Sequence, residues 1–283
     1  MHLGVHTFSG LNLSRWCATL DKPHQSQPME KVIATETGDP SAAAGSPAPA
    51  RLALVIPTLH EAANIHTVLE RIGASLDPLG LPYELIVVDD DSQDGTESIV
   101  RGISAQDARV RLLVRHGQHG LAGAVSDGWK CSQAEVLGVI DADLQHPPEL
   151  LSQLWEKMQA GYDIVIASRY AQPGSMRSWN PLRRAISGLG IVLAKPLQKR
   201  ALQVKDPLSG FFLVRRRCLE GVELQRHGFK LLLEILVRGK IGSVAEVPFT
   251  FGMRQGGESK ASLATGLHYF YLLGRLWRKK RSN

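Results

Sequence analysis

Short apolar runs alternate with segments of helical spacing between residues 51 and 170. Short segments rich in apolar residues predict five strands, at 52–56, 85–88, 110–114, 136–140 and 164–167. Apolar residues at three- and four-residue intervals predict helices within 64–72, 99–103 and 121–129. Pro147-Pro148 opens a further helix, because proline fits a first turn. This alternation predicts an α/β sandwich around a mostly parallel central sheet.

The second half of the chain is less regular. Apolar positions predict helices at 185–197 and 229–237, and strands after a turn at 206–212 and at 243–251. Three glycines within 252–260 predict a flexible loop. Residues 261–283 predict a C-terminal amphipathic helix with a basic end, which suits an anionic membrane surface. A terminal helix docked on the body with a solvated tail is the alternative.

The first fifty residues differ in composition from the rest of the chain. Residues 37–50 are mostly Ala, Gly, Ser, Pro and Asp without any period, which predicts a disordered leader at 1–50. Met29 is an alternative start. We expect one folded body at 51–260, with a regular half at 51–170 and a less regular half at 171–260, followed by the helix at 261–283.

Composition narrows the class of protein. The 283 residues suffice for one large core, and a formal net charge of +6 suits an anionic partner such as a nucleotide, a phosphate or an acidic membrane. The three cysteines form no CxxC pair, so neither a zinc site nor a disulfide framework is indicated. No run approaches the roughly 18 apolar residues of a membrane span, so we expect peripheral membrane contact at most.

Polar segments follow the first, second and fourth predicted strands, at 57–61, 89–92 and 141–146. Ligands of parallel sheets sit beyond the carboxyl ends of the strands, so these segments should line one edge. Asp141, Asp143 and Gln145 would point the same way in an extended chain and offer oxygens to Mg²⁺ or Mn²⁺. The alternative is a polar strand-to-helix turn with an N-cap aspartate.

Other polar clusters could also bind a ligand. Three consecutive carboxylates at Asp89, Asp90 and Asp91 repel one another unless they are bound, and one could accept hydrogen bonds from a base or ribose. Asp91 or Ser92 could instead cap a helix. Two basic groups could hold phosphates or be solvated loops. They are Arg254 with Lys260, and Arg169 with Arg183 and Arg184.

Several functions are disfavoured by missing motifs. No GxGxxG follows the first strand, no GxxxxGK[ST] occurs, and no HExxH occurs, which disfavours dinucleotide oxidoreductases, P-loop NTPases and zincins. Nucleic acid is also disfavoured as a partner. The aromatic residues of 261–283 lie on the apolar stripe and do not alternate with basic residues.

Seven blocks together carry a family resemblance. In chain order they read VIPTLHEAANI, VVDDDSQDGT, DADLQHPPEL, ASRY, DPLSGFF, GFKLLLEIL and EVPFTFGMRQGGESK. With these blocks, residues 52–260 resemble the polyprenyl-phosphate sugar transferases of glycosyltransferase family 2, of the dolichyl-phosphate mannose synthase type. The resemblance implies a GT-A, Rossmann-like fold and a metal-dependent, inverting transfer of a hexose, mannose from GDP-mannose, to a polyprenyl or dolichyl phosphate. It implies a peripheral enzyme on the cytoplasmic face of a membrane, whose glycosyltransferase domain at 51–260 has a donor half at 51–170 and an acceptor half at 171–260.

The resemblance also implies roles for individual residues. The nucleotide-sugar site would comprise Pro57, Leu59, Glu61, Val88, Asp90, Asp141, Ala142, Asp143, Ile166, Lys230, Arg254 and Lys260. The acceptor phosphate would be held by Arg169, Arg183 and Ser187. Asp141, Asp143 and Gln145 would hold the metal, Mg²⁺ or Mn²⁺, and Asp143 and Arg169 would be catalytic.

The sequence departs from the family pattern at two places. Leu59-His60 stands where the family usually has an aromatic residue and Asn, and the segment 120–123 has its second glycine one place late. Both departures leave the donor base open. Three alternatives therefore remain: UDP-glucose or another nucleotide sugar as donor, a soluble glycan as acceptor, or a non-catalytic nucleotide-binding protein.

Overall fold

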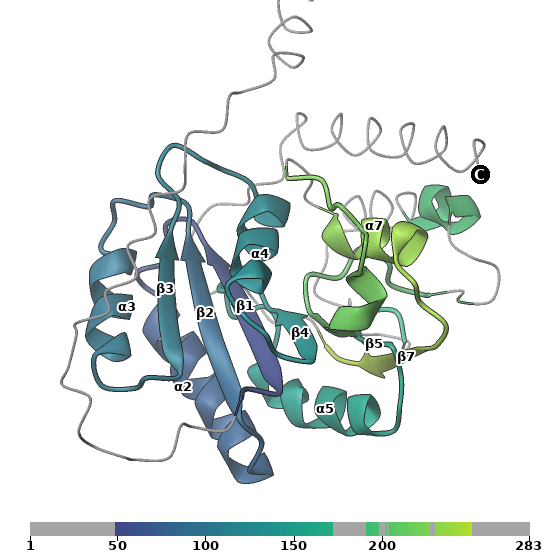
Figure 1. Cartoon of the computed structure of the whole chain (residues 1–283), viewed down its shortest axis with the longest axis horizontal. Coiled ribbons are helices and arrows are strands. Elements are labelled where there is room, and N and C mark those ends of the chain that lie inside the picture. The colour runs from purple at the N-terminus through teal and green to yellow at the C-terminus, as the bar shows by residue number, and fades with distance from the viewer. Residues whose placement is uncertain (1–48, 172–190, 198–201, 203, 227–229, 251–283) are drawn as a thin grey trace, which may run out of the picture. The chain divides into compact units, whose positions relative to one another are not determined.

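A seven-stranded sheet forms the centre of the protein (Figure 1). The computed structural model describes residues 49–171, 191–197, 202, 204–226 and 230–250. The strands are β1 (Leu52–Thr58), β2 (Tyr83–Asp89), β3 (Val110–Val114), β4 (Val136–Val139), β5 (Ile164–Ser168), β6 (Phe212–Arg215) and β7 (Val244–Pro248). Their order across the sheet is β3-β2-β1-β4-β6-β5-β7. All neighbours are parallel except β6, which runs antiparallel to both β4 and β5.

Helices cover both faces of this sheet. The α-helices are α2 (Ile65–Leu76), α3 (Thr96–Ser104), α4 (Leu121–Lys130), α5 (Leu151–Gln159) and α7 (Leu231–Arg238). Four short 3-10 turns are η1 (Asp77–Leu79), η2 (Pro148–Leu150), η3 (Lys195–Leu197) and η4 (Arg216–Leu219). Apolar residues of α2, α3 and α5 pack on one face, and those of α4 and α7 pack on the other.

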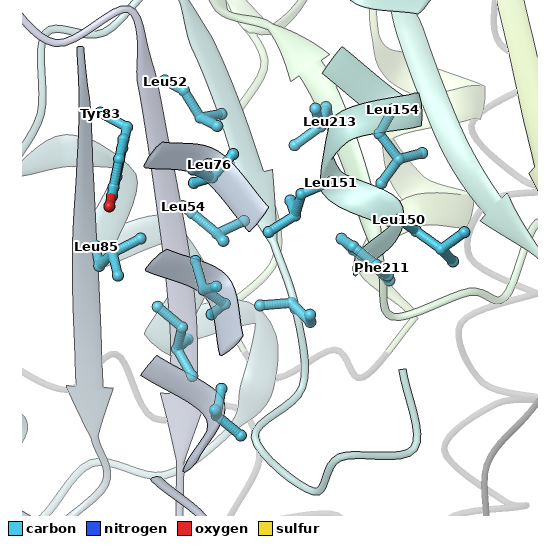
Figure 2. Packing of buried hydrophobic residues seen from close by; sticks show 14 of the residues in the cluster. Leu52, Leu54, Leu76, Tyr83, Leu85, Leu150, Leu151, Leu154, Phe211 and Leu213 are labelled. Carbon is cyan, nitrogen blue, oxygen red and sulfur yellow. The ribbon is translucent and has the colours of Figure 1, made fainter. Parts of the chain in front are cut away.

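The core follows from the pleat of the strands. In β1, Leu52, Leu54 and Ile56 point to the α2 and α5 side, and Ala53 and Val55 point to the α4 side. All five are fully buried. Figure 2 shows the first of these two layers, in which side chains of β1 and β2 meet those of α2 and α5. A parallel sheet covered on both faces needs such continuous apolar runs, which is why the strands were visible in the sequence.

Most element predictions for the first half are confirmed, with small shifts at the ends. The mostly parallel sheet is confirmed as well. The strand expected after the turn at 206–212 is β6, but its antiparallel insertion between β4 and β5 was not predicted. Of the helix expected at 185–197, residues 191–194 are helical and are followed by η3.

Some predictions fall outside the described residues. These are the leader up to residue 48, the acceptor-half segment 172–190, and everything from residue 251 to the end, including the expected amphipathic helix. Within the described part of the chain, no helix combines the length and the apolar character that a membrane crossing needs.

Candidate active site

The loops after β1 and β2 meet at one edge of the sheet, as the sequence predicted. Side chains of the second loop bind the backbone and side chain of the first. The bonds are Thr58 Oγ1 to Asp89 Oδ1 (2.7 Å), His60 N to Ser92 Oγ (2.9 Å), Glu61 N to Thr96 Oγ1 (3.2 Å) and Ala62 N to Asp94 Oδ2 (3.1 Å). Because three backbone N–H groups donate to fixed side chains, the two loops form one platform.

The three consecutive aspartates have three different environments. Asp89 is buried and accepts from Thr58 and from both the backbone and the hydroxyl of Ser92. Asp90 is buried and accepts from the backbone N–H of Gly120 at 2.8 Å. Asp91 has a positive φ of 59° and points toward His116, with 3.2 Å between the carboxylate and Nδ1. The repulsion is therefore relieved by separate donors.

The capping alternative for this segment is wrong. Helix α3 has Gly95 at its N-cap position, and neither Asp91 nor Ser92 caps it. Asp94 binds the first turn instead, with one carboxylate oxygen accepting from both the backbone and the hydroxyl of Thr96. The sequence signal for this role was the DGT turn itself, in which an aspartate side chain reaches the backbone two residues later.

The acidic segment after β4 is a turn. Strand β4 ends at Val139, Leu144 has a positive φ of 58°, and the backbone N–H of Gln145 donates to Asp143 Oδ1 at 3.1 Å. The expected extended conformation, with three side chains on one side, is therefore wrong for this segment. The two carboxylates still lie at the carboxyl end of β4, where a turn rather than a strand presents them.

A cavity of about 190 Å³ lies at this strand end. It is lined by Leu121, Val139, Asp141, His146, Arg169, Leu208, Ser209, Gly210, Phe212, Lys230 and Leu231. One carboxylate and two cationic side chains therefore share a pocket whose remaining walls are largely apolar. The sequence analysis singled out Asp141, Arg169 and Lys230 but missed the contribution of residues 208–210.

Asp141 has a strongly shifted pKa. It is raised to about 7, first by burial and then by the charge of Asp143, while Lys230 and Arg169 oppose the shift. Its carboxylate lies directly against Gly210, where a Cβ atom would stand only 2.4 Å from Oδ2. Glycine is therefore the residue that leaves space for this carboxylate.

The acidic pair fits a divalent cation. The raised pKa of Asp141 means that a positive counter-charge favours its ionised form, and hard cations prefer carboxylate oxygens. Among the described residues, no three His, Cys, Asp or Glu side chains have metal-binding spacing. A cation held by Asp141, Asp143 and Gln145 would thus take its further ligands from substrate phosphates or water, as Mg²⁺ usually does.

Arg169 is fixed by a partner that the sequence analysis missed. Its guanidinium donates twice to the fully buried Asp206, through Nε and Nη2 at 2.7 Å each, and its backbone N–H donates at 3.0 Å. Burial acts to lower the pKa of Arg169, but the bonds to Asp206 outweigh it and the pKa is raised. Glu246 in turn accepts from the backbone N–H of Asp206. The only sign of Asp206 in the sequence was a single aspartate shortly before an apolar strand.

Lys230 and His146 complete the polar lining. Lys230 occupies the N-cap position of α7, and burial lowers its pKa to about 8, with Arg169 adding to the effect. His146 is buried with Nδ1 3.5 Å from Asp141 Oδ2, and its ring packs against Phe211 and Phe249. Burial lowers the pKa of His146 to about 3, so its imidazole is neutral near pH 7.

The remaining predicted site residues divide into three groups. Pro57, near the end of β1, is half-buried, and so are Leu59 and Glu61 on the loop after it. Val88, Ala142 and Ile166 are buried, and Val88 and Ile166 belong to the α4-side core. Arg183, Ser187, Arg254 and Lys260 lie outside the described residues, so their expected roles at the acceptor and on a closing loop stay predictions.

Comparison with known proteins identifies related sequences. Residues 53–222 match the family model described as glycosyl transferase family 2. The chain is 42% identical over 226 residues to a dolichol-phosphate mannosyltransferase of Pyrococcus furiosus, covering 80% of this chain and 63% of that protein. It is 36% identical to a dolichol-phosphate mannosyltransferase of Saccharomyces cerevisiae, covering 79% of this chain and 86% of the relative. The chain thus spans less than two thirds of the archaeal relative's length.

Solved structures support the fold. The chain superposes with a TM-score of 0.57 and 21% identity on glucosyl-3-phosphoglycerate synthase of Mycobacterium tuberculosis, in complex with Mn²⁺, uridine diphosphate and phosphoglyceric acid. The match covers 80% of this chain and 78% of that one. A mannosyl-3-phosphoglycerate synthase of Rubrobacter xylanophilus gives a TM-score of 0.56 at 19% identity, with 82% and 74% covered. The expected GT-A fold is confirmed, and at this identity the likeness carries the fold alone.

Proposed function

The chain belongs to glycosyl transferase family 2, and from this premise we propose that it transfers mannose from GDP-mannose to a polyprenyl phosphate with inversion at the anomeric carbon. The observation that carries the proposal is the shared cavity of Asp141, Arg169 and Lys230 at the strand ends. The proposed donor and acceptor both carry phosphate groups. A carboxylate that favours binding of a cation, together with two basic side chains, suits such a pair of substrates. The names of the relatives support mannose and a lipid phosphate.

The donor would lie across the platform made by the loops after β1 and β2. Asp90 is a buried acceptor at the end of β2 and would receive N–H groups of the base. Pro57, Leu59 and Glu61 would border the nucleoside. Lys230 would face the diphosphate, and so would Arg254 and Lys260 on the loop beyond residue 250.

A divalent cation would be held by Asp141, Asp143 and Gln145. Once bound, it would supply positive charge against the departing diphosphate. Lys230 would add a cation to the same charge, and its lowered pKa places its protonation change near pH 8. Gly210 would keep the Asp141 carboxylate in place by leaving room for it.

The acceptor phosphate would be held by Arg169, with Arg183 and Ser187 from the segment after β5. A phosphate is already anionic near pH 7, so its oxygen can attack without a general base. Catalysis would then consist of positioning and charge stabilisation. Asp206 fixes the Arg169 guanidinium through two bonds, which limits how far Arg169 can draw charge from the attacking oxygen. Attack from the face opposite the diphosphate gives a β-linked product from an α-linked donor.

The test uses the full purified chain with a polyprenyl phosphate, labelled GDP-mannose, and Mg²⁺ or Mn²⁺. We expect a lipid-linked mannose that moves into the organic phase and is β-linked. Asp143→Asn should lower turnover by about 100-fold or more, in line with the loss of a precisely placed charge. If no labelled product forms from GDP-mannose, UDP-glucose or any other common donor, the proposed enzymatic transfer is contradicted.

Two assays separate the remaining alternatives. Parallel reactions with UDP-glucose decide the donor, because only the preferred donor should show saturation at low concentration. Flotation with vesicles of zwitterionic and anionic lipid tests peripheral association with a membrane, which we propose on the cytoplasmic face. A chain that stays with the soluble fraction and glycosylates a free glycan would favour the soluble acceptor instead.

A further inference from the structure

Four charged side chains form a row beneath the donor platform. Asp90, Arg115 and Asp127 are buried, and Arg226 closes the row at the surface with 43% of its side chain exposed. Arg115 Nη1 lies 3.1 Å from Asp90 Oδ1, and Arg115 Nε lies 3.4 Å from Asp127 Oδ2. Asp127 belongs to α4, which packs on β1 and β2 (Figure 1).

Two atoms of this row lack a hydrogen bond despite being buried. Asp90 Oδ1 and Arg115 Nε have none among the described residues, because their charged neighbours are near but poorly aligned. Buried polar atoms are normally satisfied, and one that is not calls for an explanation such as an absent ligand. Asp90 stands at the carboxyl end of β2, on the edge where ligands of such sheets bind.

Arg115 lies between two carboxylates that compete for it. The competition is decided by Arg226, whose two terminal nitrogens each donate to an oxygen of Asp127 at 2.6 Å. Arg226 also donates to Gln118 at 2.8 Å, which fixes its guanidinium. With both oxygens of Asp127 engaged, Arg115 remains close to Asp90.

We propose that Arg115 is a positioning residue that holds the Asp90 carboxylate ionised and oriented toward the donor's base. The ion pair of Arg226 with Asp127 keeps Arg115 available for this task. The inference rests on the proposed function, since it assumes a nucleotide donor. It adds a specificity determinant: an ionised carboxylate accepts hydrogen bonds from the N–H groups of guanine or uracil, whereas adenine presents an acceptor at the matching ring nitrogen.

The electrostatics agree with this geometry. Burial raises the pKa of Asp90, and the Gly120 N–H and Arg115 oppose that shift. Without Arg115, the carboxyl group would be more readily protonated, and a protonated carboxyl can donate to adenine. Loss of Arg115 should therefore weaken the binding of guanine nucleotides and at the same time reduce the preference over adenine.

The experiment measures binding of GDP, UDP and ADP to the full chain with Mg²⁺ by calorimetry. Wild-type protein should bind GDP or UDP more tightly than ADP. Arg115→Gln should weaken that binding by about tenfold or more, as expected for truncating one partner of a buried charged pair, and should shrink the ratio to ADP. Arg115→Lys keeps a cation and should recover part of the preference.

Arg226→Gln should also weaken GDP or UDP binding, although the side chain is largely outside the site, because Asp127 would then draw Arg115 away from Asp90. Adding Asp127→Asn removes the competitor, so the double variant should bind better than Arg226→Gln alone. Arg111→Gln is the matched control. Arg111 is a half-exposed arginine of β3, outside the charged row, and its loss should leave binding unchanged.

The outcomes are distinguishable. A wild-type chain that binds none of the three nucleotides contradicts the proposed function itself. A wild-type chain that binds them all equally, or an Arg115→Gln variant with wild-type affinity and preference, overturns the role of Arg115. So does an Arg115→Gln variant that only melts at a lower temperature and loses affinity for all three nucleotides equally. If the double variant does not fold, the Gln and Lys variants of Arg115 still decide.

Discussion

At the scale of single residues, Gly210 stands out because its lack of a side chain leaves space for the Asp141 carboxylate. Gly210→Ala would place a Cβ 2.4 Å from the Asp141 carboxylate, which must then move. A displaced carboxylate would hold the cation poorly, and misplacement of about 1 Å in an active site can cost about 100-fold. We expect a transfer rate lower by about that factor and weaker Mn²⁺ binding, measured by turnover and by metal titration.

The control for this change is Gly102→Ala in α3, where the added Cβ meets nothing within 4 Å. We expect unchanged turnover and a helix stabilised by about 0.5–1 kcal/mol, the usual gain of alanine over glycine. Wild-type metal affinity in Gly210→Ala would show that Asp141 is not crowded by this position.

The charge of Lys230 predicts that GDP binding weakens as the pH rises. Burial lowers its pKa to about 8, so Lys230 is mostly cationic about one unit below that pH, half cationic near it, and loses its charge as the pH rises further. A bound diphosphate favours the cation. GDP affinity measured with Mg²⁺ should therefore be constant up to about pH 8 and then fall by up to about tenfold per pH unit.

Lys230→Arg serves as the comparison, because an arginine stays charged throughout this range. Its GDP affinity should be flat between pH 7 and about pH 9.5 even if its absolute value is lower. The same decline in the arginine variant would assign the pH dependence to another group.

At the scale of elements, the two loops after β1 and β2 depend on the side chain of Asp89. It receives three hydrogen bonds from Thr58 and Ser92 and is buried. Asp89→Asn puts a donor where donors already point, and we expect a loss of about 1–3 kcal/mol in unfolding free energy. Asp91→Asn, two residues on, keeps a residue type that tolerates positive φ. It should change the free energy of unfolding by less than about 0.5 kcal/mol. Urea unfolding measures both, and equal losses would contradict a special role for Asp89.

Strands β1, β2, β4 and β5 were predictable because nearly all of their residues are buried on both faces of the sheet. The edge strand β3 has one exposed and three half-buried residues, yet it too was placed correctly from its apolar residues. The direction and neighbours of β6 were not predictable, because an apolar run carries no information on which strand it will pair with. Its place between β4 and β5 is decided by long-range contacts such as the packing of Leu213 on Gly138.

For the candidate site, the sequence predicted three of the residues that line the cavity, Asp141, Arg169 and Lys230, but not the local geometry. Asp141 and Asp143 were found from their place after a strand, but the extended conformation failed at Leu144, whose positive φ is unusual for a leucine. Asp206 was missed since it lies 37 residues from Arg169, and an isolated aspartate announces no partner. Contacts of this kind arise from the tertiary fold and leave no local pattern.

At the scale of the whole molecule, the described core begins with β1. Leu52, Ala53, Leu54 and Val55 are fully buried in a central strand. Deleting residues 1–48 should leave the melting temperature and nucleotide binding unchanged, because this deletion spares every strand of the described part of the chain. Deleting residues 1–55 should abolish cooperative unfolding, because four buried side chains of the central strand are lost. Differential scanning calorimetry of both variants tests this, and a clear drop in melting temperature for the shorter deletion would contradict the predicted boundary.

The clasp between Arg169 and Asp206 has a consequence for how this molecule could diversify. The chain leaves the sheet at the end of β5 and returns at the start of β6, and the clasp ties these two points together at the same edge. The two ends of the 36-residue segment 170–205 are therefore held by this pair and not by strand register alone. A graft of the segment must keep small or apolar residues at 194, 197 and 204, because the side chains there are buried. Grafting it between relatives should change which acceptor is recognised while the sheet and the nucleotide platform stay as they are.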